Sequence, residues 1–261
     1  MTRFARPLQA RLATLPEMAW STSSYACVFA AMLALSACSR ASSTSQATTG
    51  ASAGPITATD PPGTYLGRTL ASPMSYQGAD WLERADRETT EQPEHVLDVL
   101  GLKEGMTVAD VGAGSGYFTV RIGKRVGPRG RVLATDLQPE MLGMLRANVA
   151  KASLTNVVPV LATESDAKLP GKELDLVLMV DVYHELPRPA ATLAQVRAAL
   201  RPEGRLALVE YRAEDPDVPI KPEHKTTLSQ VRRELEANGF VFRSSDESLP
   251  QQRIIVFTPA P

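Results

Sequence analysis

The chain has 261 residues, is 43% hydrophobic and carries a formal net charge of −1, which provides enough apolar material for one or two packed domains. This balanced charge lacks the electrostatic signature of a nucleic-acid-binding protein and argues against that class of partner. The only two cysteines, Cys27 and Cys38, precede the residues that we expect to fold, which excludes a disulfide framework and a cysteine-based metal site from the domain.

The first 37 residues have the pattern of a targeting segment. Arginines at positions 3, 6 and 11 give a basic start, and Tyr25–Leu35 is an uncharged, largely apolar run that is too short to span a bilayer. The segment closes with Leu35-Ser36-Ala37-Cys38, which resembles the lipobox of bacterial lipoprotein signal peptides. The resemblance implies removal of residues 1–37 and lipidation of Cys38, and Ser39 in the next position implies sorting to the outer membrane of the cell envelope. The alternative is a misplaced translation start in front of a cytoplasmic protein.

Residues 38–78 are expected to form a flexible tether, and residues 79–261 the folded domain. The stretch from Arg40 to Gly63 consists of Ser, Thr, Ala, Gly and Pro with hardly a large apolar side chain. Beyond the tether, Asp80–Leu100 has the apolar pattern of two short helices separated near Pro93. These helices either pack on a sheet edge or fold over a ligand bound at the end of the first strand.

A strand, a tight turn and a helix are predicted between Met106 and Val126. The apolar run that begins at Met106 ends in three glycines, Gly112, Gly114 and Gly116, and an amphipathic pattern follows at once. Glycines tolerate positive φ and let a ligand approach the backbone closely, and the helix that follows presents unpaired N–H groups. Taken alone, the glycines also fit an ordinary strand-to-helix turn.

An acidic residue at the end of the second predicted strand favours a nucleoside ligand. Arg131–Thr135 is a short apolar strand that ends in Asp136, 20 residues after Gly116. Doubly wound folds hydrogen-bond a ribose from an acidic residue at this spacing.

The remaining chain alternates between strand and helix patterns. The predicted strands are Asn156–Leu161, Leu174–Val180 and Arg205–Glu210, the helices are Pro139–Ala152, Arg188–Leu200 and Thr226–Asn238, and Phe240–Arg243 with Arg253–Thr258 forms a closing hairpin. A turn is expected at Pro202–Gly204. The continuous apolar run Leu174–Val180 is typical of a strand buried on both faces of a parallel sheet. This alternation predicts an open α/β sheet with right-handed crossovers.

The motifs together resemble those of class I S-adenosylmethionine-dependent methyltransferases. Asp110–Gly116 matches the acidic-x-Gly-x-Gly-x-Gly pattern of that family at every position. Further matches are Asp136, Asp166-Ala167 followed by Leu169-Pro170, and Leu200–Gly204. The resemblance implies a Rossmann-like, mostly parallel seven-stranded sheet with a C-terminal antiparallel hairpin and helices on both faces. It also implies S-adenosyl-L-methionine as the cofactor.

The same resemblance implies a set of cofactor-binding residues. They are Asp110, Gly112, Ala113, Gly114, Gly116, Asp136, Leu137, Asp166 and Asp181. The family assigns Gly112 and Gly114 to the methionine portion, Asp136 to the ribose hydroxyls, and an acidic residue near Asp166 to the adenine amino group. The gap before the Leu-Pro pair is one residue shorter than usual, so Glu164 is an alternative to Asp166.

A dinucleotide-dependent oxidoreductase is the rival nucleotide-binding enzyme. Its fingerprint is Gly-x-Gly-x-x-Gly, but here the third glycine comes one residue too early. Tyr117 occupies the place where that fingerprint wants Gly or Ala, and Asp110 belongs to the methyltransferase pattern. The motif therefore favours methyl transfer over hydride transfer.

Acid–base groups concentrate in Asp181–Glu185, directly after the fourth predicted strand. His184 is the first candidate for a general base because histidine titrates nearest neutrality, and Tyr183, Glu185 and Tyr211 follow. A base is optional, since the methyl carbon of a sulfonium is already electrophilic, and a structural hydrogen bond is the alternative role for His184. His224 is expected to be a solvated loop residue, and the alternative is that it folds over the site. A metal site built from His184, Glu185 and His224 has no supporting ligand spacing, so none is predicted.

We therefore expect methyl transfer from S-adenosylmethionine to an unidentified small-molecule acceptor, without a nucleic-acid partner and with a membrane anchor at Cys38. S-adenosylmethionine is a cytosolic metabolite, whereas the leader points outside the cytosol. This conflict keeps a second hypothesis open, a lipoprotein sensor that binds the nucleoside without transferring a methyl group. The sequence does not indicate an oligomeric state.

Overall fold

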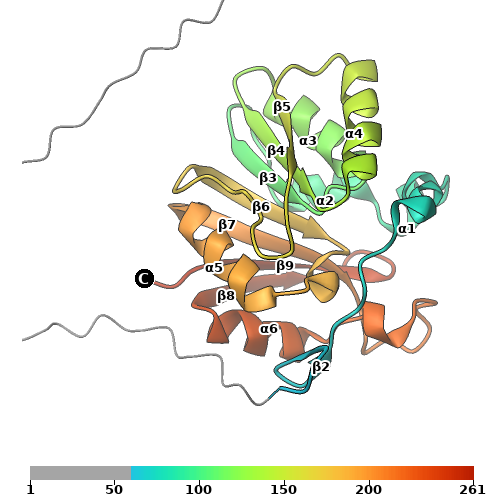
Figure 1. Ribbon diagram of the computed structural model, residues 1–261, viewed down its shortest axis with the longest axis vertical. Helices are drawn as coiled ribbons and strands as arrows, with labels where there is room; N and C mark the ends of the chain where they lie inside the picture. Colours follow the sequence, from blue (N-terminus) through green and yellow to red (C-terminus); the bar gives the residue numbers. More distant parts are fainter. Residues whose placement is uncertain (1–59) are drawn as a thin grey trace, which may run out of the picture. The chain divides into compact units, whose positions relative to one another are not determined.

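A seven-stranded sheet organises the computed structural model, which describes residues 60–261 (Figure 1). Its strands are β3 (Thr107–Val111), β4 (Arg131–Asp136), β5 (Val157–Leu161), β6 (Leu174–Val180), β7 (Leu200–Tyr211), β8 (Phe240–Asp246) and β9 (Gln252–Pro259). They lie in the order β5-β4-β3-β6-β7-β9-β8, and β9 runs antiparallel to both of its neighbours. The predicted Rossmann-like sheet with its C-terminal hairpin is confirmed.

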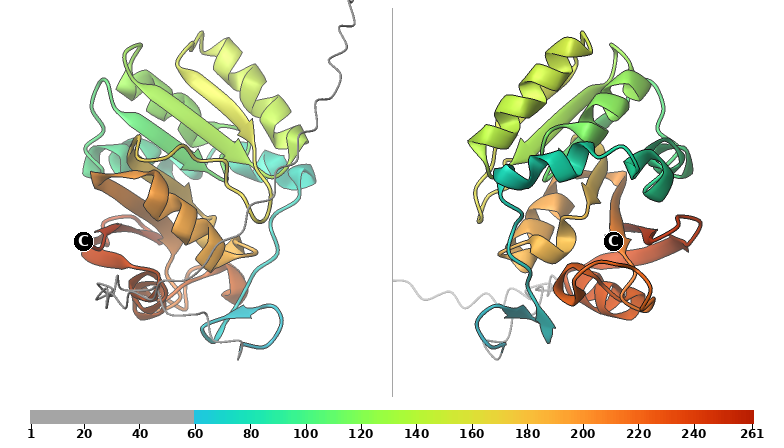
Figure 2. Two further views of the ribbon diagram at one scale, coloured as in Figure 1. Left: turned by 60° about the vertical axis from the view of Figure 1, so that its left-hand side comes forward. Right: turned by 90° about the vertical axis from the view of Figure 1, so that its right-hand side faces the viewer.

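Helices cover both faces of the sheet, and the two layers can be followed in Figure 2. The helices are α1 (Arg87–Thr90), α2 (Pro93–Val99), α3 (Tyr117–Val126), α4 (Pro139–Lys151), α5 (Pro189–Ala199) and α6 (Leu228–Ala237), with short 3-10 helices η1 (Tyr76–Glu83), η2 (Tyr183–Glu185) and η3 (Pro222–His224). Buried side chains of α5 and α6 pack on one face, and those of α2, α3 and α4 pack on the other.

Strand β6 explains why the central strands are apolar throughout. Leu176 and Leu178 pack with α2 and α3, while Val177 and Met179 point to the opposite face and pack with α5 and α6. Because alternate side chains of a strand face opposite sides, a strand with helices on both sides requires apolar residues at successive positions.

Strand β7 begins earlier than the sequence predicts. The expected turn at Pro202–Gly204 is instead part of an extended strand in which Leu200 pairs with Leu174, followed by a shift of register. A Cβ atom at Gly204 would lie 2.7 Å from the carbonyl oxygen of Leu174, so only glycine lets the two backbones approach this closely.

The folded part also begins before residue 79, within the segment that we expected to be a tether. A small hairpin of β1 (Thr64–Tyr65) and β2 (Arg68–Thr69) lies beside α6 (Figure 1). Arg68 forms an ion pair of 2.9 Å with the buried Glu234 of that helix. The predicted signal peptide, Cys38 and the rest of the tether up to residue 59 lie outside the described residues. None of the helices within residues 60–261 combines the length and the apolar composition that crossing a bilayer requires.

Candidate functional site

A cavity of about 1200 Å³ lies at the carboxyl ends of the central strands. Its wall includes Gly112 after β3, Asp136 at the end of β4, Asp181 after β6 and Tyr211 at the end of β7. Open α/β sheets bind their ligands at this edge. Ligand pockets usually measure about 300–1,000 Å³, so this cavity has room for two molecules side by side.

The glycine turn forms one wall of the cavity through its backbone. Gly112, Gly114 and Gly116 have φ angles of 71°, 55° and 89°, a region of backbone conformation that residues other than glycine rarely adopt. A Cβ atom at Gly114 would lie 2.8 Å from Cδ1 of Leu82, so the Leu82 side chain would have to shift. Gly112 and Gly114 line the cavity, whereas Gly116 ends the turn as the N-cap of α3.

Asp136 ties this turn to the end of β4. Its Oδ2 accepts a 2.8 Å hydrogen bond from the Gly114 N–H, and its Oδ1 accepts one of 2.9 Å from the Gln138 N–H. The side chain is 8% exposed and lines the cavity together with Leu137. Burial raises the pKa of Asp136, and the hydrogen bonds from the backbone oppose that rise.

Asp110 supports the turn from outside the cavity. It is buried in β3 and accepts a hydrogen bond of 2.5 Å from the Thr119 hydroxyl of α3. Burial raises the pKa of Asp110 to about 6, against the lowering effect of Thr119, while the charge of Asp136 raises it further. Asp110 and Ala113 do not line the cavity, so their contribution is to hold the glycine turn in place.

Of the two acidic candidates before β6, Glu164 lines the cavity and Asp166 does not. The Asp166 carboxylate accepts a 2.8 Å hydrogen bond from the Lys168 N–H and forms a 2.6 Å ion pair with the Lys168 ammonium group. The structure thus brings the alternative residue, not the first candidate, to the site.

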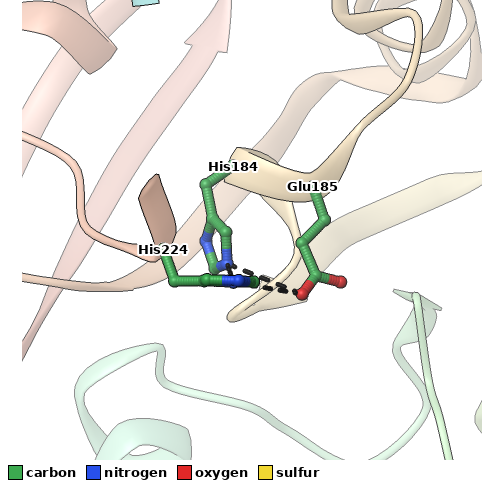
Figure 3. A group of neighbouring side chains, drawn as sticks. All are labelled: His184, Glu185 and His224. Carbon is green, nitrogen blue, oxygen red and sulfur yellow. Dashed lines mark hydrogen bonds and ion pairs between the residues drawn. The ribbon is translucent and has the colours of Figure 1, made fainter. Parts of the chain in front are cut away.

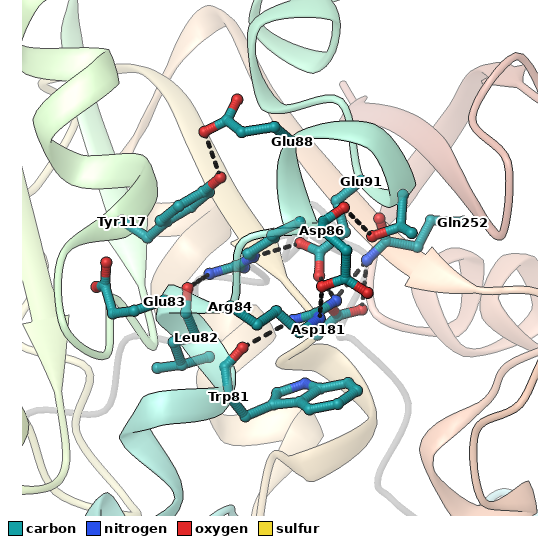
Figure 4. A network of polar contacts seen from close by, with 12 residues as sticks. Trp81, Leu82, Glu83, Arg84, Asp86, Glu88, Glu91, Tyr117, Asp181 and Gln252 are labelled. Atoms are coloured by element: carbon teal, nitrogen blue, oxygen red, sulfur yellow. Dashed lines mark hydrogen bonds and ion pairs between the residues drawn. The ribbon is translucent and has the colours of Figure 1, made fainter.

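Both roles considered for the helices before β3 occur: η1 and α1 fold over the cavity, while α2 packs on the sheet. Glu91 is buried and accepts hydrogen bonds from Arg84 at 2.5 Å and from Arg87 at 2.7 Å (Figure 4). The Arg84 guanidinium lies 4.0 Å above the ring of Trp81. All four residues line the cavity, and the ion pairs hold this cover as a unit.

Asp181 adds a half-buried acidic group to the cavity wall. It follows β6 with a φ of 53°, and Nε2 of Gln252 donates to both of its oxygens at 2.9 and 2.8 Å. Burial holds the pKa of Asp181 well above its usual range, and the nearby carboxylates of Glu91 and Glu210 raise it further.

His184 and Glu185 line the cavity from η2, and His224 joins them from η3. Nδ1 of His184 lies 2.6 Å from Oε2 of Glu210, and both side chains are buried. Burial lowers the pKa of His184, but the adjacent Glu210 carboxylate outweighs that effect and the net pKa is raised. His224, which we expected in a solvated loop, instead lies 3.1 Å from His184.

Tyr183 is the one acid–base candidate that the fold withdraws from the cavity. Its hydroxyl donates a 2.6 Å hydrogen bond to Oε2 of Glu234, and the side chain is fully buried in the core. Tyr183 therefore fixes η2 against α6, whereas Tyr211 remains in the cavity wall.

Sequence reasoning missed the contribution of Arg68–Met74, which crosses the cavity and lines it. The Met74 N–H donates to Oε2 of Glu185 at 3.3 Å, and the Met74 carbonyl accepts from Nε2 of Gln138 at 2.8 Å. The segment is short and has little apolar periodicity, so only Arg68, Leu70 and Met74 distinguish it from the preceding tether.

Comparisons with known proteins agree with this geometry. A protein-family profile described as "Methyltransferase domain" matches residues 109–206. A solved SAM-dependent methyltransferase from Aquifex aeolicus is 30% identical, with a TM-score of 0.67 over 71% of this chain and 98% of that one.

Two curated relatives match over shorter stretches. An arsenite methyltransferase from Halobacterium salinarum is 29% identical over 52% of this chain and 37% of its own length. A protein-L-isoaspartate O-methyltransferase from Methanothrix thermoacetophila is 30% identical over 52% of this chain and 63% of its own length. The chain thus spans less than two thirds of either curated relative, and the acceptors in their names differ.

Proposed function

The chain belongs to the S-adenosylmethionine-dependent methyltransferases, and from that premise we propose that it transfers a methyl group from S-adenosylmethionine to a small-molecule acceptor. The observation that carries this proposal is the pairing of the glycine turn with Asp136 at one end of a cavity large enough for two molecules. We call Gly112–Gly116 with Asp136 the donor wall, and His184, Glu185 and His224 the acceptor wall.

The donor wall fits the methyl donor. Gly112 and Gly114 leave backbone without side chains at the cavity surface, which suits the methionine portion of the ligand. Asp136 offers acceptor lone pairs for ribose hydroxyls, and Glu164 is in place for the adenine amino group. When bound, S-adenosylmethionine supplies an electrophilic methyl group on a positively charged sulfur, and the acidic groups of the cavity complement that charge.

The chain's own residues contribute positioning and exclusion of water. Holding a nucleophile in line with a reactive carbon supplies about 7–11 kcal/mol of a barrier, so no covalent help from the protein is required. Trp81 and Leu82 cover the cavity, and the Arg84–Glu91 ion pair holds that cover closed. The acceptor wall presents polar atoms to the second molecule.

Transfer of a labelled methyl group tests the proposal. The purified full-length chain is incubated with methyl-tritiated S-adenosylmethionine and a small-molecule extract, and label is expected in an extract component. Gly114→Arg should abolish that label, because the substitution fills the donor wall. Binding of S-adenosylhomocysteine without any labelled product from extracts of the native host would contradict transfer and support the sensor hypothesis.

We further propose that the protein is a lipoprotein of the cell envelope. Support comes from the basic start, the apolar run Tyr25–Leu35 and the lipobox-like Leu35-Ser36-Ala37-Cys38. Membrane fractionation and mass spectrometry of the mature N-terminus are expected to find a lipidated Cys38 in the membrane fraction. An unmodified cytosolic chain that begins near Met74 would contradict this location.

A further inference from the structure

The acceptor wall brings together two histidines and a carboxylate from two separate connections. His184 and Glu185 belong to η2, which follows β6, and His224 belongs to η3, which follows β7. Their side chains point toward one another across the wall of the cavity (Figure 3). Neighbouring parallel strands end at the same edge of the sheet, so the fold joins residues that are 40 positions apart in the chain.

The three facing atoms form a compact triangle. Nε2 of His184 lies 3.1 Å from Nδ1 of His224 and 3.8 Å from Oε1 of Glu185, and the last two atoms are 3.4 Å apart. A point about 2.0 Å from all three atoms therefore exists, and bonds from zinc to imidazole nitrogen or carboxylate oxygen are about 2.0–2.2 Å long.

Hydrogen bonds alone account poorly for this triangle. One proton can bridge the two histidine nitrogens, but Oε1 of Glu185 forms no hydrogen bond within residues 60–261. The same carboxylate is anchored through its other oxygen, which accepts from the Met74 N–H. Oε1 thus faces both imidazole rings from within the cavity wall.

A second layer of contacts holds His184 in the orientation of a metal ligand. Glu210 is fully buried, and its Oε2 accepts from Nδ1 of His184 at 2.6 Å, which leaves the Nε2 lone pair toward the other two side chains. The His184 carbonyl accepts from Arg68 and from the Ala71 N–H, each at 3.1 Å. Histidines that bind metals are usually oriented by such a carboxylate.

We propose that His184, Glu185 and His224 bind a divalent transition-metal ion of the zinc type. Nitrogen and oxygen ligands of this kind suit zinc, iron and manganese, and three protein ligands leave a coordination position open toward the cavity. That position can hold an anionic oxygen or sulfur atom of the methyl acceptor. This last role rests on the proposed methyl transfer, whereas metal binding itself does not.

Cobalt(II) absorption spectroscopy of the full-length chain tests the proposal, with Cys27→Ser and Cys38→Ser included so that no thiolate competes for the metal. One equivalent of cobalt is expected to give a visible absorption band, and zinc is expected to displace it. His224→Ala should weaken cobalt binding more than about 100-fold, and Glu210→Gln by about 10–100-fold, because second-layer partners contribute that much to affinity.

His95→Ala is the matched control, because His95 lies on α2 beside Ser248 and outside the cavity. The control should bind cobalt like the parent chain. His224 is 28% exposed, so its loss leaves the core intact, and continued binding of S-adenosylhomocysteine checks the fold independently. Absence of the band, or a band that survives His224→Ala, would overturn the metal site without affecting the proposed methyl donor.

Discussion

The donor wall and the acceptor wall line one cavity, yet they are built differently. The donor wall combines the glycine turn Gly112–Gly116 with Asp136, 20 residues further along the chain, and the turn acts through its backbone. The acceptor wall joins side chains from η2 and η3, and the hairpin segment around Arg68 supports it. A site built from a local backbone turn can be recognised from a sequence motif. A site whose side chains are brought together by the fold comes from separate positions that carry no motif.

This difference also predicts that the two walls bind their ligands independently of each other. No residue belongs to both walls. Each wall is held by a different carboxylate: Asp110 bonds to α3 beside the glycine turn, and Glu210 bonds to His184. Substitutions in one wall should therefore change binding at that wall and leave the other largely intact.

Gly114→Arg should have the largest effect. The new side chain starts 2.8 Å from Leu82 at a φ of 55°, so it strains the turn and fills the donor wall. We expect no measurable S-adenosylhomocysteine binding by calorimetry, while cobalt binding to the acceptor wall persists. Gly171→Arg is the control, because a side chain there meets open space. Equal binding by both variants would contradict the role of the turn.

Asp110→Asn should change the pH dependence of stability. The pKa of Asp110 is raised from 3.8 to about 6 by burial, so its contribution to stability is complete below about pH 4 and is lost as the pH rises through about 6. This difference corresponds to about 3 kcal/mol in the free energy of unfolding. Urea unfolding of the parent chain and of Asp110→Asn between about pH 4 and about pH 7 measures this difference. Asp136 and Arg87, whose charges also act on the pKa of Asp110, are present in both proteins. Parallel curves would show that Asp110 ionises normally.

Asp136→Ala should weaken donor binding by about 10–100-fold, because the ribose hydroxyls lose a charged acceptor, and hydrogen bonds to charged groups contribute about 1.5–3 kcal/mol. Asp136→Asn keeps one acceptor oxygen, so its donor affinity should fall between those of the parent chain and Asp136→Ala. Calorimetry with S-adenosylhomocysteine checks the order. An alanine variant that binds as tightly as the parent would remove Asp136 from the donor wall.

Glu164→Ala should have the smallest effect, a loss of less than about 10-fold in S-adenosylhomocysteine affinity, as expected for one hydrogen bond of about 0.5–1.5 kcal/mol. Asp166→Ala should leave that affinity unchanged, since its carboxylate is paired with Lys168 outside the cavity. The reverse order in the same titration would restore Asp166 as the adenine ligand.

The fold was largely predictable because its signals are local. The apolar run of β6, the glycine turn and the closing hairpin each follow from residues adjacent in sequence. The start of β7 at Leu200 was missed because the fit of Gly204 against Leu174 depends on a neighbouring strand. Arg68 was assigned to a tether because its partner Glu234 lies on a helix far along the chain.

The residues of the site, like the elements of the fold, were predictable where their sequence signal is local. Gly112, Gly114 and Asp136 reach the cavity as their motif indicates. The sequence also placed His184 and Tyr183 together, but their side chains point in opposite directions from η2, one into the cavity and one into the core. The position of His224 depends on the long connection after β7, for which the sequence carries no periodic signal.

Calorimetric titration of the full-length chain with S-adenosylhomocysteine tests the central claim most directly, because it measures the donor wall without knowledge of the acceptor. The account predicts saturable binding at one site per chain, lost in Gly114→Arg and retained in His224→Ala. The absence of any heat of binding in the unsubstituted protein would contradict it.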